Sequence, residues 1–488
     1  MPCCMCEKHE WKDPQEVVYT DPEDGKEYCL FHAPAEHKGM DVDDFNAQVS
    51  ERIQATIDLE DEEARCDLSG TIFPGKICFD KECKLPDISF SFCVFVEGAD
   101  FRSVKFGGAA YFRSVKFGGA AYFDSAEFRR HAKLRSVIFG GGAYFDSAEF
   151  RRHAKLRSVI FGGGADFRSA EFGGYASFRE ASFGGAAKFR SVKFGGYASF
   201  SEASFGGIAY FVSAEFGGAA DFREASFEWY AFFGSAKFGG NTDFGEASFV
   251  RDASFSLSQF AKETVFKAIT FKGSPDTTLY FSNCTLPAEM LTFQDCDDLS
   301  HLDLNDQMDL ANIRFHECSW GDNGRIQLRV EDKALSPTRD LYQRMKAKYK
   351  DENNEYEASK WHVAEKEAQL KILARSKGET FNWCMLWLYK LVSGFGENPG
   401  RAFGVLACLL VVPLLFCIMD IEANFFGLIF HSHQVAEPMV QWLKFVPLTR
   451  AITGGEPGYL RVLMFFWQLL ITLQAALFAF ALRNNFRR

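Results

Sequence analysis

A phenylalanine recurs through the middle of this chain with a period of 11 residues. The segment 101–111 is repeated identically by the next eleven residues. Counting in steps of 11 from Phe106 to Phe271 gives sixteen positions, all of them Phe. Counting from Phe101 to Phe266 gives sixteen more, fourteen Phe and two Leu. A repeat this regular predicts an array of similar structural units, each of which contacts mainly its neighbours.

The spacing inside the repeat excludes a long helix and a long straight strand. Phe101 and Phe106 are five residues apart, about 140° around a helix of 3.6 residues per turn, so they cannot share one seam. Gly-Gly pairs in most repeats would each cost a helix about 2 kcal/mol. In a straight strand, a step of five turns the side chain to the opposite face. Short strands joined by corners satisfy the spacing. On each such face, the Phe points inward, and so does the small or β-branched residue two positions before it.

The intervals between successive Phe alternate between five and six residues, which predicts corners of two and three residues. Four faces then make one coil of 22 residues. We expect Gly107-Gly108 and its equivalents in the longer corner, where a positive φ would favour glycine. Each coil would bury four large side chains, each worth about 1.5–3 kcal/mol.

Ala-x-Phe followed by two or three corner residues resembles the pentapeptide-repeat family, in its Phe-rich eleven-residue variant. The resemblance implies a mainly β fold, a right-handed quadrilateral β-helix with the central residues stacked inside. Bacterial membrane members of this family carry a C-terminal two-helix module that is described as potassium-channel-like. We therefore expect four regions: a Cys/His segment with a capping helix over 1–65, the solenoid over 66–320, a helical linker over 321–380, and a membrane module over 381–488.

Two metal-ligand pairs, Cys3-x-x-Cys6 and Cys29-x-x-His32, stand near the start of the chain. Three thiolates and one imidazole suit a closed tetrahedral site for structural zinc, with no open position for chemistry. The stretch also looks like the small Cys/His knuckle that precedes some pentapeptide-repeat membrane proteins. The alternative is a Cys-bearing terminus that binds no metal. Spare ligands are present in Cys4 and His9.

The segment 41–59 carries apolar residues at intervals of four, which predicts an amphipathic helix. We expect this helix to cover the exposed first coil, because the end of a solenoid needs a cap.

The net charge of −11 comes from the N-terminal region, where residues 1–65 hold 18 Asp/Glu against 6 Lys/Arg. The repeat over 99–271 is mildly basic, with 22 Lys/Arg against 17 Asp/Glu. Some soluble pentapeptide-repeat proteins imitate DNA with an acidic rod. A basic rod disfavours that function, and we expect no nucleic-acid partner.

One basic surface recurs within the repeat, because residues 122–143 are copied identically at 144–165. The copy should stack like side chains one coil apart. The surface is either a docking stripe for an acidic protein partner or lipid headgroups, or the incidental product of a tandem duplication. Its residues are Arg129, Arg130, Lys133, Arg151, Arg152 and Lys155.

Two uncharged segments, 402–419 and 462–482, are long enough to cross a bilayer. Residues 381–392 predict an interfacial helix. Basic residues precede the first span and follow the second, so both termini should be cytoplasmic in a multi-pass protein of the inner membrane. The 14 Cys without a signal peptide agree with a reducing compartment.

The loop between these spans contains a semi-apolar stretch, 438–452, which could re-enter the membrane as a pore helix. Two-helix cation channels are built in this way, from a span, a re-entrant loop and a second span. Such channels require an oligomer to enclose the pore. The following segment, 453–459, departs from the carbonyl-lined filter of potassium channels, so potassium selectivity is unsupported. In the second span, Gln468 and Thr472 either line a pore or hold helices together.

These features favour an oligomeric inner-membrane protein whose cytoplasmic solenoid controls or localises a two-helix membrane module, with an ion pore as one form of that module. The alternative is a membrane-anchored scaffold without channel activity. Membrane lipid, further copies of the chain and a cytoplasmic protein bound to the solenoid are the expected partners. We expect no enzyme activity, since the sequence offers no nucleophile with a base and acid, no phosphate loop and no open metal site.

Overall fold

The computed structural model describes residues 3–9, 16–59, 65–81, 84–272, 277–286, 291–307, 310–321, 326, 328, 334–418, 441–447 and 458–487. These residues form two compact units, Met1–Val330 and Glu331–Arg488, and each unit is described by itself.

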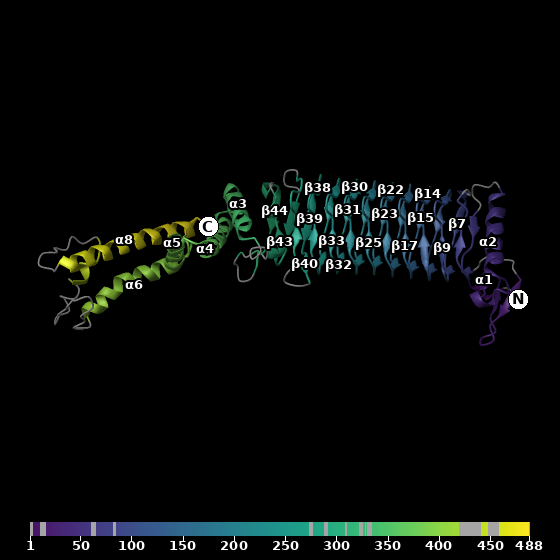
Figure 1. Cartoon of the computed structure of the whole chain (residues 1–488), viewed down its shortest axis with the longest axis horizontal. Coiled ribbons are helices and arrows are strands. Elements are labelled where there is room, and N and C mark those ends of the chain that lie inside the picture. The colour runs from purple at the N-terminus through teal and green to yellow at the C-terminus, as the bar shows by residue number, and fades with distance from the viewer. Residues whose placement is uncertain are drawn as a thin grey trace. The chain divides into compact units, whose positions relative to one another are not determined.

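The first unit contains a parallel β-solenoid, as the repeat predicts (Figure 1). From β3 to β37, each strand pairs in parallel with the fourth strand after it, so that Lys105 of β10 (Lys105–Phe106) aligns with Glu127 of β14 (Glu127–Phe128). This register confirms a coil of 22 residues with four faces. The faces form four sheets of 12, 11, 10 and 9 strands.

The strands are short because each one ends at a corner. The first coil consists of β3 (Arg65–Asp67), β4 (Ile72–Phe73), β5 (Ile77–Cys78) and β6 (Lys84–Leu85). A regular coil consists of β10, β11 (Ala110–Tyr111), β12 (Lys116–Phe117) and β13 (Ala120–Tyr122). The last strands are β42 (Leu291–Gln294), β43 (Leu302–Asp303) and β44 (Ile313–His316). Two 3-10 turns, η2 (Leu299–His301) and η3 (Leu310–Asn312), lie among them.

The core of the solenoid is a set of stacked phenylalanine columns. Phe123 stacks on Phe145 of the next coil, with ring centroids 4.7 Å apart and planes 1° from parallel. It also meets Phe112 on a neighbouring face edge-to-face, at 5.8 Å and 84°. Leu134 and Leu156, which interrupt the Phe series, are fully buried as well. Stacked and edge-to-face pairs are the favoured aromatic geometries, so the periodic Phe residues form one continuous core.

The corners differ from the expectation in one respect, since the positive φ angles do not fall on the glycine doublets. They fall on the second residue of the two-residue corners, such as Ser103 at 58° and Glu180 at 58°. Glycine is needed in the longer corners because successive coils approach closely there. A Cβ on Gly119 would lie 1.7 Å from the carbonyl oxygen of Glu97.

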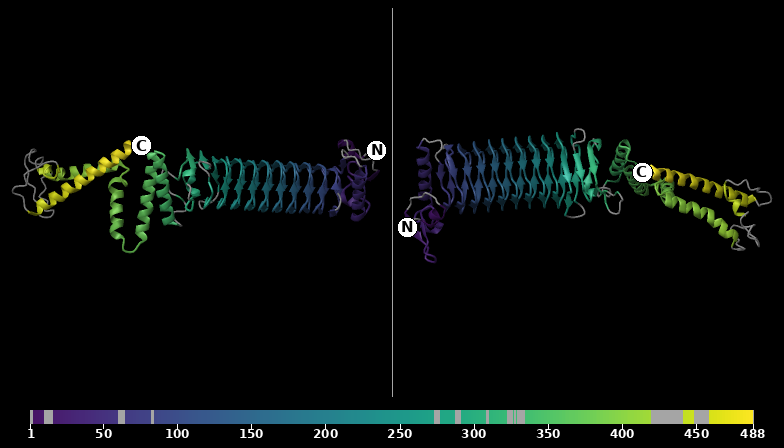
Figure 2. Two further views of the ribbon diagram at one scale, coloured as in Figure 1. Left: turned by 90° about the horizontal axis from the view of Figure 1, so that it is seen from above. Right: turned by 180° about the vertical axis from the view of Figure 1, so that it is seen from behind.

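The N-terminal region closes one end of the solenoid (Figures 1 and 2). It contains α1 (Cys4–His9), the hairpin of β1 (Val17–Thr20) and β2 (Glu27–Cys29), η1 (Ala35–His37) and α2 (Val42–Ile57). The Asp41 side chain caps α2 by accepting from the N–H of Asp44. Phe45 of α2 is fully buried and contacts Phe73 of the first coil edge-to-face, with ring centroids 6.0 Å apart.

The second unit is helical. A helical pair, α3 (Leu335–Asp351) and α4 (Glu355–Arg375), is joined by Asn353 at a φ of 58° and by Asn354, which caps α4. Trp361 of α4 is fully buried between the two helices. The expected interfacial helix corresponds to α5 (Thr380–Ser393).

The two expected spans correspond to α6 (Pro399–Ile418) and α8 (Gly458–Phe486), which lie side by side (Figure 2). Within the described residues, one helix, Arg461–Phe486, is long and apolar enough to cross a membrane, and the apolar part of α6 is shorter. The expected re-entrant stretch is described only over 441–447, and 453–457 lie outside the described residues.

Candidate metal centre and contacts of the membrane unit

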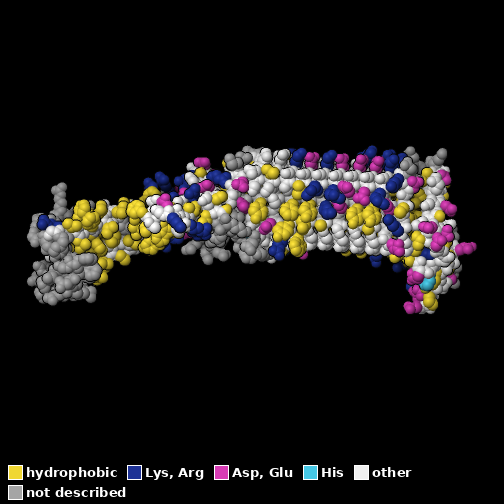
Figure 3. Space-filling model, in the orientation of Figure 1, with side chains coloured by type: hydrophobic (Ala, Val, Ile, Leu, Met, Phe, Trp, Pro, Cys, Tyr) yellow, Lys and Arg dark blue, Asp and Glu magenta, His cyan; other side chains and the backbone are white. Residues whose placement is uncertain are grey.

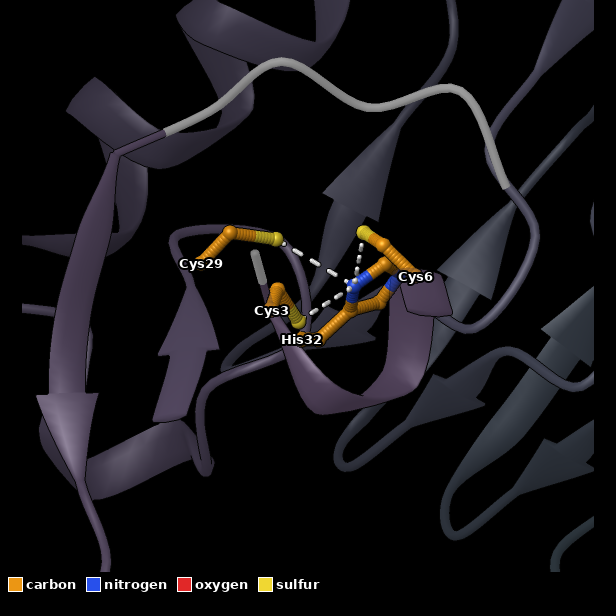
Figure 4. A group of neighbouring side chains, drawn as sticks. All are labelled: Cys3, Cys6, Cys29 and His32. Atoms are coloured by element: carbon orange, nitrogen blue, oxygen red, sulfur yellow. Dashed lines mark hydrogen bonds between the residues drawn. The ribbon is translucent and has the colours of Figure 1, made fainter. Parts of the chain in front are cut away.

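The structure brings Cys3, Cys6, Cys29 and His32 together into one buried cluster (Figure 4). The three Sγ atoms lie 3.4, 3.4 and 3.2 Å from Nδ1 of His32. All four ligand atoms lie within 4.8 Å of one another. The cluster is therefore compact enough for one ion to contact every ligand atom.

Short local elements position the ligands. Cys3 and Cys6 lie at the start and inside the first turns of α1, so both thiols project from one end of that helix. Cys29 is the last residue of β2, and the chain then turns, with the N–H of His32 donating to the carbonyl oxygen of Cys29 over 3.1 Å. The two spaced pairs thus come from a helix and a hairpin that face each other.

A hydrogen bond on the far side of the imidazole fixes which nitrogen faces the thiols. Nε2 of His32 lies 3.0 Å from the carbonyl oxygen of Ser69. A carbonyl only accepts hydrogen bonds, so Nε2 carries the proton and Nδ1 presents its lone pair to the three sulfurs. Metal-bound histidines have this arrangement, in which the second nitrogen donates to a carbonyl or carboxylate.

The donor set fits structural zinc. A tetrahedral ion with ordinary zinc–sulfur and zinc–nitrogen bonds would separate sulfur from nitrogen by ~3.6 Å, close to the distances between Nδ1 and the thiols. Burial alone would raise the pKa of the Cys3 thiol, but backbone hydrogen bonds from Cys29, Cys6 and Met5 outweigh it and lower that pKa. A lowered pKa favours the thiolate, the form that binds metal.

The spare ligands of the sequence lie outside this cluster. Burial raises the pKa of the Cys4 thiol, which favours its neutral form. The imidazole of His9 stacks on Phe92, with ring centroids 5.6 Å apart. The cluster that the structure describes therefore contains the four residues expected from the paired spacing.

Backbone contacts connect this Cys/His segment to the solenoid. The N–H of Ile72 in β4 donates to the carbonyl oxygen of Phe31 over 2.9 Å. Elsewhere in the same sheet, the carbonyl oxygen that accepts this hydrogen bond belongs to the preceding coil. Nζ of Lys38 donates to the carbonyl oxygens of Leu30 and Phe31 over 2.7 and 2.8 Å. Burial lowers the pKa of Lys38 to about 7. Sequence reasoning missed Lys38, because a lysine is almost always expected at the surface.

The duplicated basic surface lies on the solenoid with its two copies in register, as shown by Lys133 opposite Lys155. Carboxylates engage part of it, since Arg151 lies 3.5 Å from Glu127 and 3.4 Å from Glu149. Arg129 likewise lies 3.3 Å from Glu127. Arg130 and Arg152 are exposed. The pairing reduces the positive charge that this surface presents.

The polar residues of the second span contact their own chain. Nε2 of Gln468 donates to the carbonyl oxygen of Lys444 over 2.7 Å, and the Thr472 hydroxyl donates to the carbonyl oxygen of Gln468 over 2.8 Å. The sequence missed Gln474, which is buried and donates to the carbonyl oxygen of Ala402 on α6 over 2.7 Å. Gln468 and Gln474 thus bond to other segments of the chain, and the choice between pore lining and helix packing for Gln468 and Thr472 stays a prediction of the sequence.

A proline inside α6 explains one further contact between the helices. Pro413 has no N–H, so the carbonyl oxygen of Leu409, four residues before it, lacks its usual helical donor. The indole N–H of Trp467 on α8 donates to the carbonyl oxygen of Leu409 over 2.9 Å. The indole N–H of Trp442 donates to the carbonyl oxygen of Leu410 over 2.6 Å. The one carbonyl oxygen that the proline frees, that of Leu409, is thus satisfied from within the protein.

Comparison with known proteins bears on the solenoid. Comparison with curated proteins and with solved structures gave no match. A family model for pentapeptide repeats, described as nine copies, matches residues 101–149, 145–193 and 189–229. The matched residues make up about a quarter of the chain and lie within the regular coils. Over these coils the chain is similar to pentapeptide-repeat proteins.

Proposed function

We propose that this protein is a membrane-anchored scaffold. In this function the solenoid is a rigid rod on the cytoplasmic side, the Cys/His cluster binds a structural zinc ion that closes its N-terminal end, and α6 with α8 anchors the chain in the inner membrane. Basic residues before α6 and at the end of α8 support cytoplasmic placement of both termini.

The exposed apolar surface of α8 carries this proposal, and hydrophobic side chains cover most of the visible face of α6 and α8 (Figure 3). Between Val462 and Leu473, six large apolar side chains are 47% to 63% exposed. A continuous apolar surface of this kind is costly in water and has no such cost in lipid. The six residues are Val462, Phe465, Phe466, Leu469, Leu470 and Leu473.

The backbone of the α6–α8 pair supports immersion in lipid as well. A hydrocarbon environment supplies no hydrogen bonds, so a proline in a membrane helix requires other donors for the carbonyls that it frees. Trp467 supplies such a donor to the Leu409 carbonyl oxygen here. The homo-oligomer, the ion pore and the solenoid-bound protein stay predictions of the sequence.

Membrane fractionation of the full-length protein tests the anchor. We expect the wild-type chain to remain in the membrane pellet after an alkaline carbonate wash. Leu469→Asp with Leu473→Asp places two charges within the apolar stretch, each costing about 3 kcal/mol at the centre of a membrane helix. The double variant should therefore move to the soluble or aggregated fraction.

A matched control comes from the solenoid, where Leu257 is 58% exposed, the same fraction as Leu473. Leu257→Asp should leave the protein in the pellet, because that leucine faces water in the proposed arrangement. Release of the wild-type chain by the carbonate wash, or equal behaviour of the two kinds of variant, would exclude the anchor.

A further inference from the structure

A cavity of about 200 Å³ lies within the second unit, where the end of α8 meets α3, α4 and the segment between α5 and α6. Its walls come from the consecutive helices α3 and α4, from Glu397, and from the end of α8. The lining residues that matter here are Lys346, Lys350, Glu355, Glu397, Arg483 and Arg487.

The lining is basic. Lys346 and Lys350 are one turn apart on α3, and Arg483 and Arg487 are one turn apart at the end of α8. Two carboxylates, Glu355 and Glu397, also line the cavity, so four cations face two anions.

Several of these charges already have partners. Glu397 accepts from the Ser359 hydroxyl over 2.7 Å and from the Asn484 amide over 3.3 Å. Lys346 is paired with Glu365 outside the cavity. Among the residues that the structure describes, Lys350, Arg483 and Arg487 form no ion pair. Three cations of the lining therefore form no ion pair within the described residues, and they outnumber the two carboxylates, Glu355 and Glu397.

The cavity lies at the point where α8 changes from apolar to charged. Residues 462–482 carry no charge, and Arg483 is the first charged residue after them. Phe480, one turn earlier, also lines the cavity. The Asn484 amide donates to the carbonyl oxygen of Gly396 over 3.2 Å, which holds the end of α8 against the segment before α6. In a membrane-anchored chain this places a preformed basic cavity at the level of the lipid headgroups.

We propose that this cavity binds the phosphate group of an anionic phospholipid headgroup. Arg483 and Arg487 would hold the phosphate oxygens, since the planar guanidinium matches phosphate in a bidentate geometry. Lys350 adds a third positive charge, and Phe480 contacts the less polar part of the headgroup. This inference rests on the membrane anchor, because a lipid reaches the cavity only if α8 is in a bilayer.

The test measures lipid binding to the purified full-length protein in detergent, with a short-chain phosphatidylglycerol as the probe and phosphatidylcholine as the neutral reference. Wild-type protein should prefer phosphatidylglycerol, and Arg483→Gln with Arg487→Gln should weaken its binding by at least about tenfold. The control is Arg375→Gln with Lys377→Gln, which removes the same charge from exposed residues of the second unit outside the cavity lining. The control should bind like the wild type.

Three results would overturn the proposal. The first is wild-type lipid affinity in the cavity variant, and the second is an equal loss of affinity in the control variant. The third is binding of glycerol 3-phosphate and inorganic phosphate to the wild type as tightly as the lipid, with the same loss in the cavity variant. The last result would assign the cavity to a soluble phosphate compound. Carbonate-washed membranes separate this outcome from failure of the anchor. The cavity variant should stay in the pellet, because its apolar stretch is unchanged, whereas a wild-type chain found in the supernatant would contradict the anchor itself.

Discussion

His32 donates a hydrogen bond from Nε2 to the carbonyl oxygen of Ser69, 3.0 Å away in the first coil of the solenoid. The same imidazole presents Nδ1 to three thiols. One ring thus connects the candidate metal centre to the β-solenoid. A metal ion at this centre would hold α1 and the β1–β2 hairpin together and would also hold both against the end of the first coil. The centre is therefore suited to stabilise the cap.

The first prediction concerns zinc content. Purified protein should contain one zinc ion per chain, measured by mass spectrometry of the metal. Cys29→Ser should lose it, because a three-ligand remnant binds zinc weakly. Cys4→Ser is the matched control and should retain the metal, since Cys4 lies outside the cluster. A zinc-free wild type, or zinc loss from both variants, would contradict the assignment.

Zinc removal should act on the first coil as well as on the cap. A chelator should increase the amide hydrogen exchange of Ile72, whose N–H donates to Phe31 in the capping segment. Exchange in a central strand such as β26 (Lys193–Phe194) should not change, because coils contact only their neighbours. Unchanged exchange at Ile72 after confirmed metal loss would show that the cap does not depend on the ion.

The solenoid could be predicted from the sequence because the residues that form its core are the ones that repeat every 11 positions. All the Phe columns point inward, and the two Leu substitutions occupy the same positions. The reason for the glycines was predicted wrongly. Sequence spacing identifies a corner, but the close approach between Gly119 and Glu97 depends on how coils stack.

The contacts that complete the candidate sites were harder to predict. Ser69 is 37 residues from His32 and acts through its backbone, which any residue type could supply. Gln474 pairs with Ala402 across two helices. The cavity at the end of α8 has walls from four separate segments. Such contacts form only through tertiary packing, so no local sequence pattern predicts them.

A core substitution tests the energetics of the columns. Phe178 is fully buried and stacks on Phe200, with ring centroids 4.9 Å apart. Phe178→Ala should lower the free energy of unfolding by about 3–5 kcal/mol, because it opens a cavity inside a close-packed stack. Phe178→Leu should cost less than about 1.5 kcal/mol, since Leu134 and Leu156 already occupy this column. Urea denaturation followed by circular dichroism measures both, and equal losses would argue against a packed column.

A glycine pair tests the close approach between coils. Gly119→Ala should destabilise the solenoid by about 2 kcal/mol or more, because the new Cβ would lie 1.7 Å from the Glu97 carbonyl oxygen. Gly164→Ala is the control, since its nearest neighbour, the carbonyl oxygen of Ala186, lies 3.7 Å away. Thermal denaturation of the two variants should separate them, and similar melting temperatures would show that the corner relaxes freely.

The helical pair should respond to pH through Glu365. Burial alone would raise the pKa of Glu365, but hydrogen bonds from His362 and Lys346 outweigh it and lower that pKa from 4.5 to about 2. The folded pKa lies below the unfolded one, so the stabilisation is complete above pH 4.5 and disappears as the pH falls toward 2.

Glu365→Gln should therefore destabilise α3 and α4 by about 1–2 kcal/mol at neutral pH, a value reduced for partial contact with water. It should also flatten the pH dependence between 4.5 and 2. Peptide-resolved hydrogen exchange over 335–375 measures the effect. Asp340→Asn is the control, because Asp340 is exposed and pairs with the partly exposed Arg339, and such pairs contribute little. An unchanged pH profile in Glu365→Gln would contradict the assignment.

The last prediction concerns the proline of α6 and uses a double-mutant cycle. Trp467→Phe keeps an aromatic ring but removes the N–H that donates to the Leu409 carbonyl oxygen, so it should lower the melting temperature in detergent by the equivalent of about 1–2 kcal/mol. Pro413→Ala restores a backbone N–H that can donate to the same oxygen within the helix. In the Pro413→Ala background, Trp467→Phe should therefore cost much less, because Leu409 then has its own helical partner. An identical cost in both backgrounds would mean that Trp467 stabilises the α6–α8 pair through ring packing alone, independently of the carbonyl that the proline leaves free.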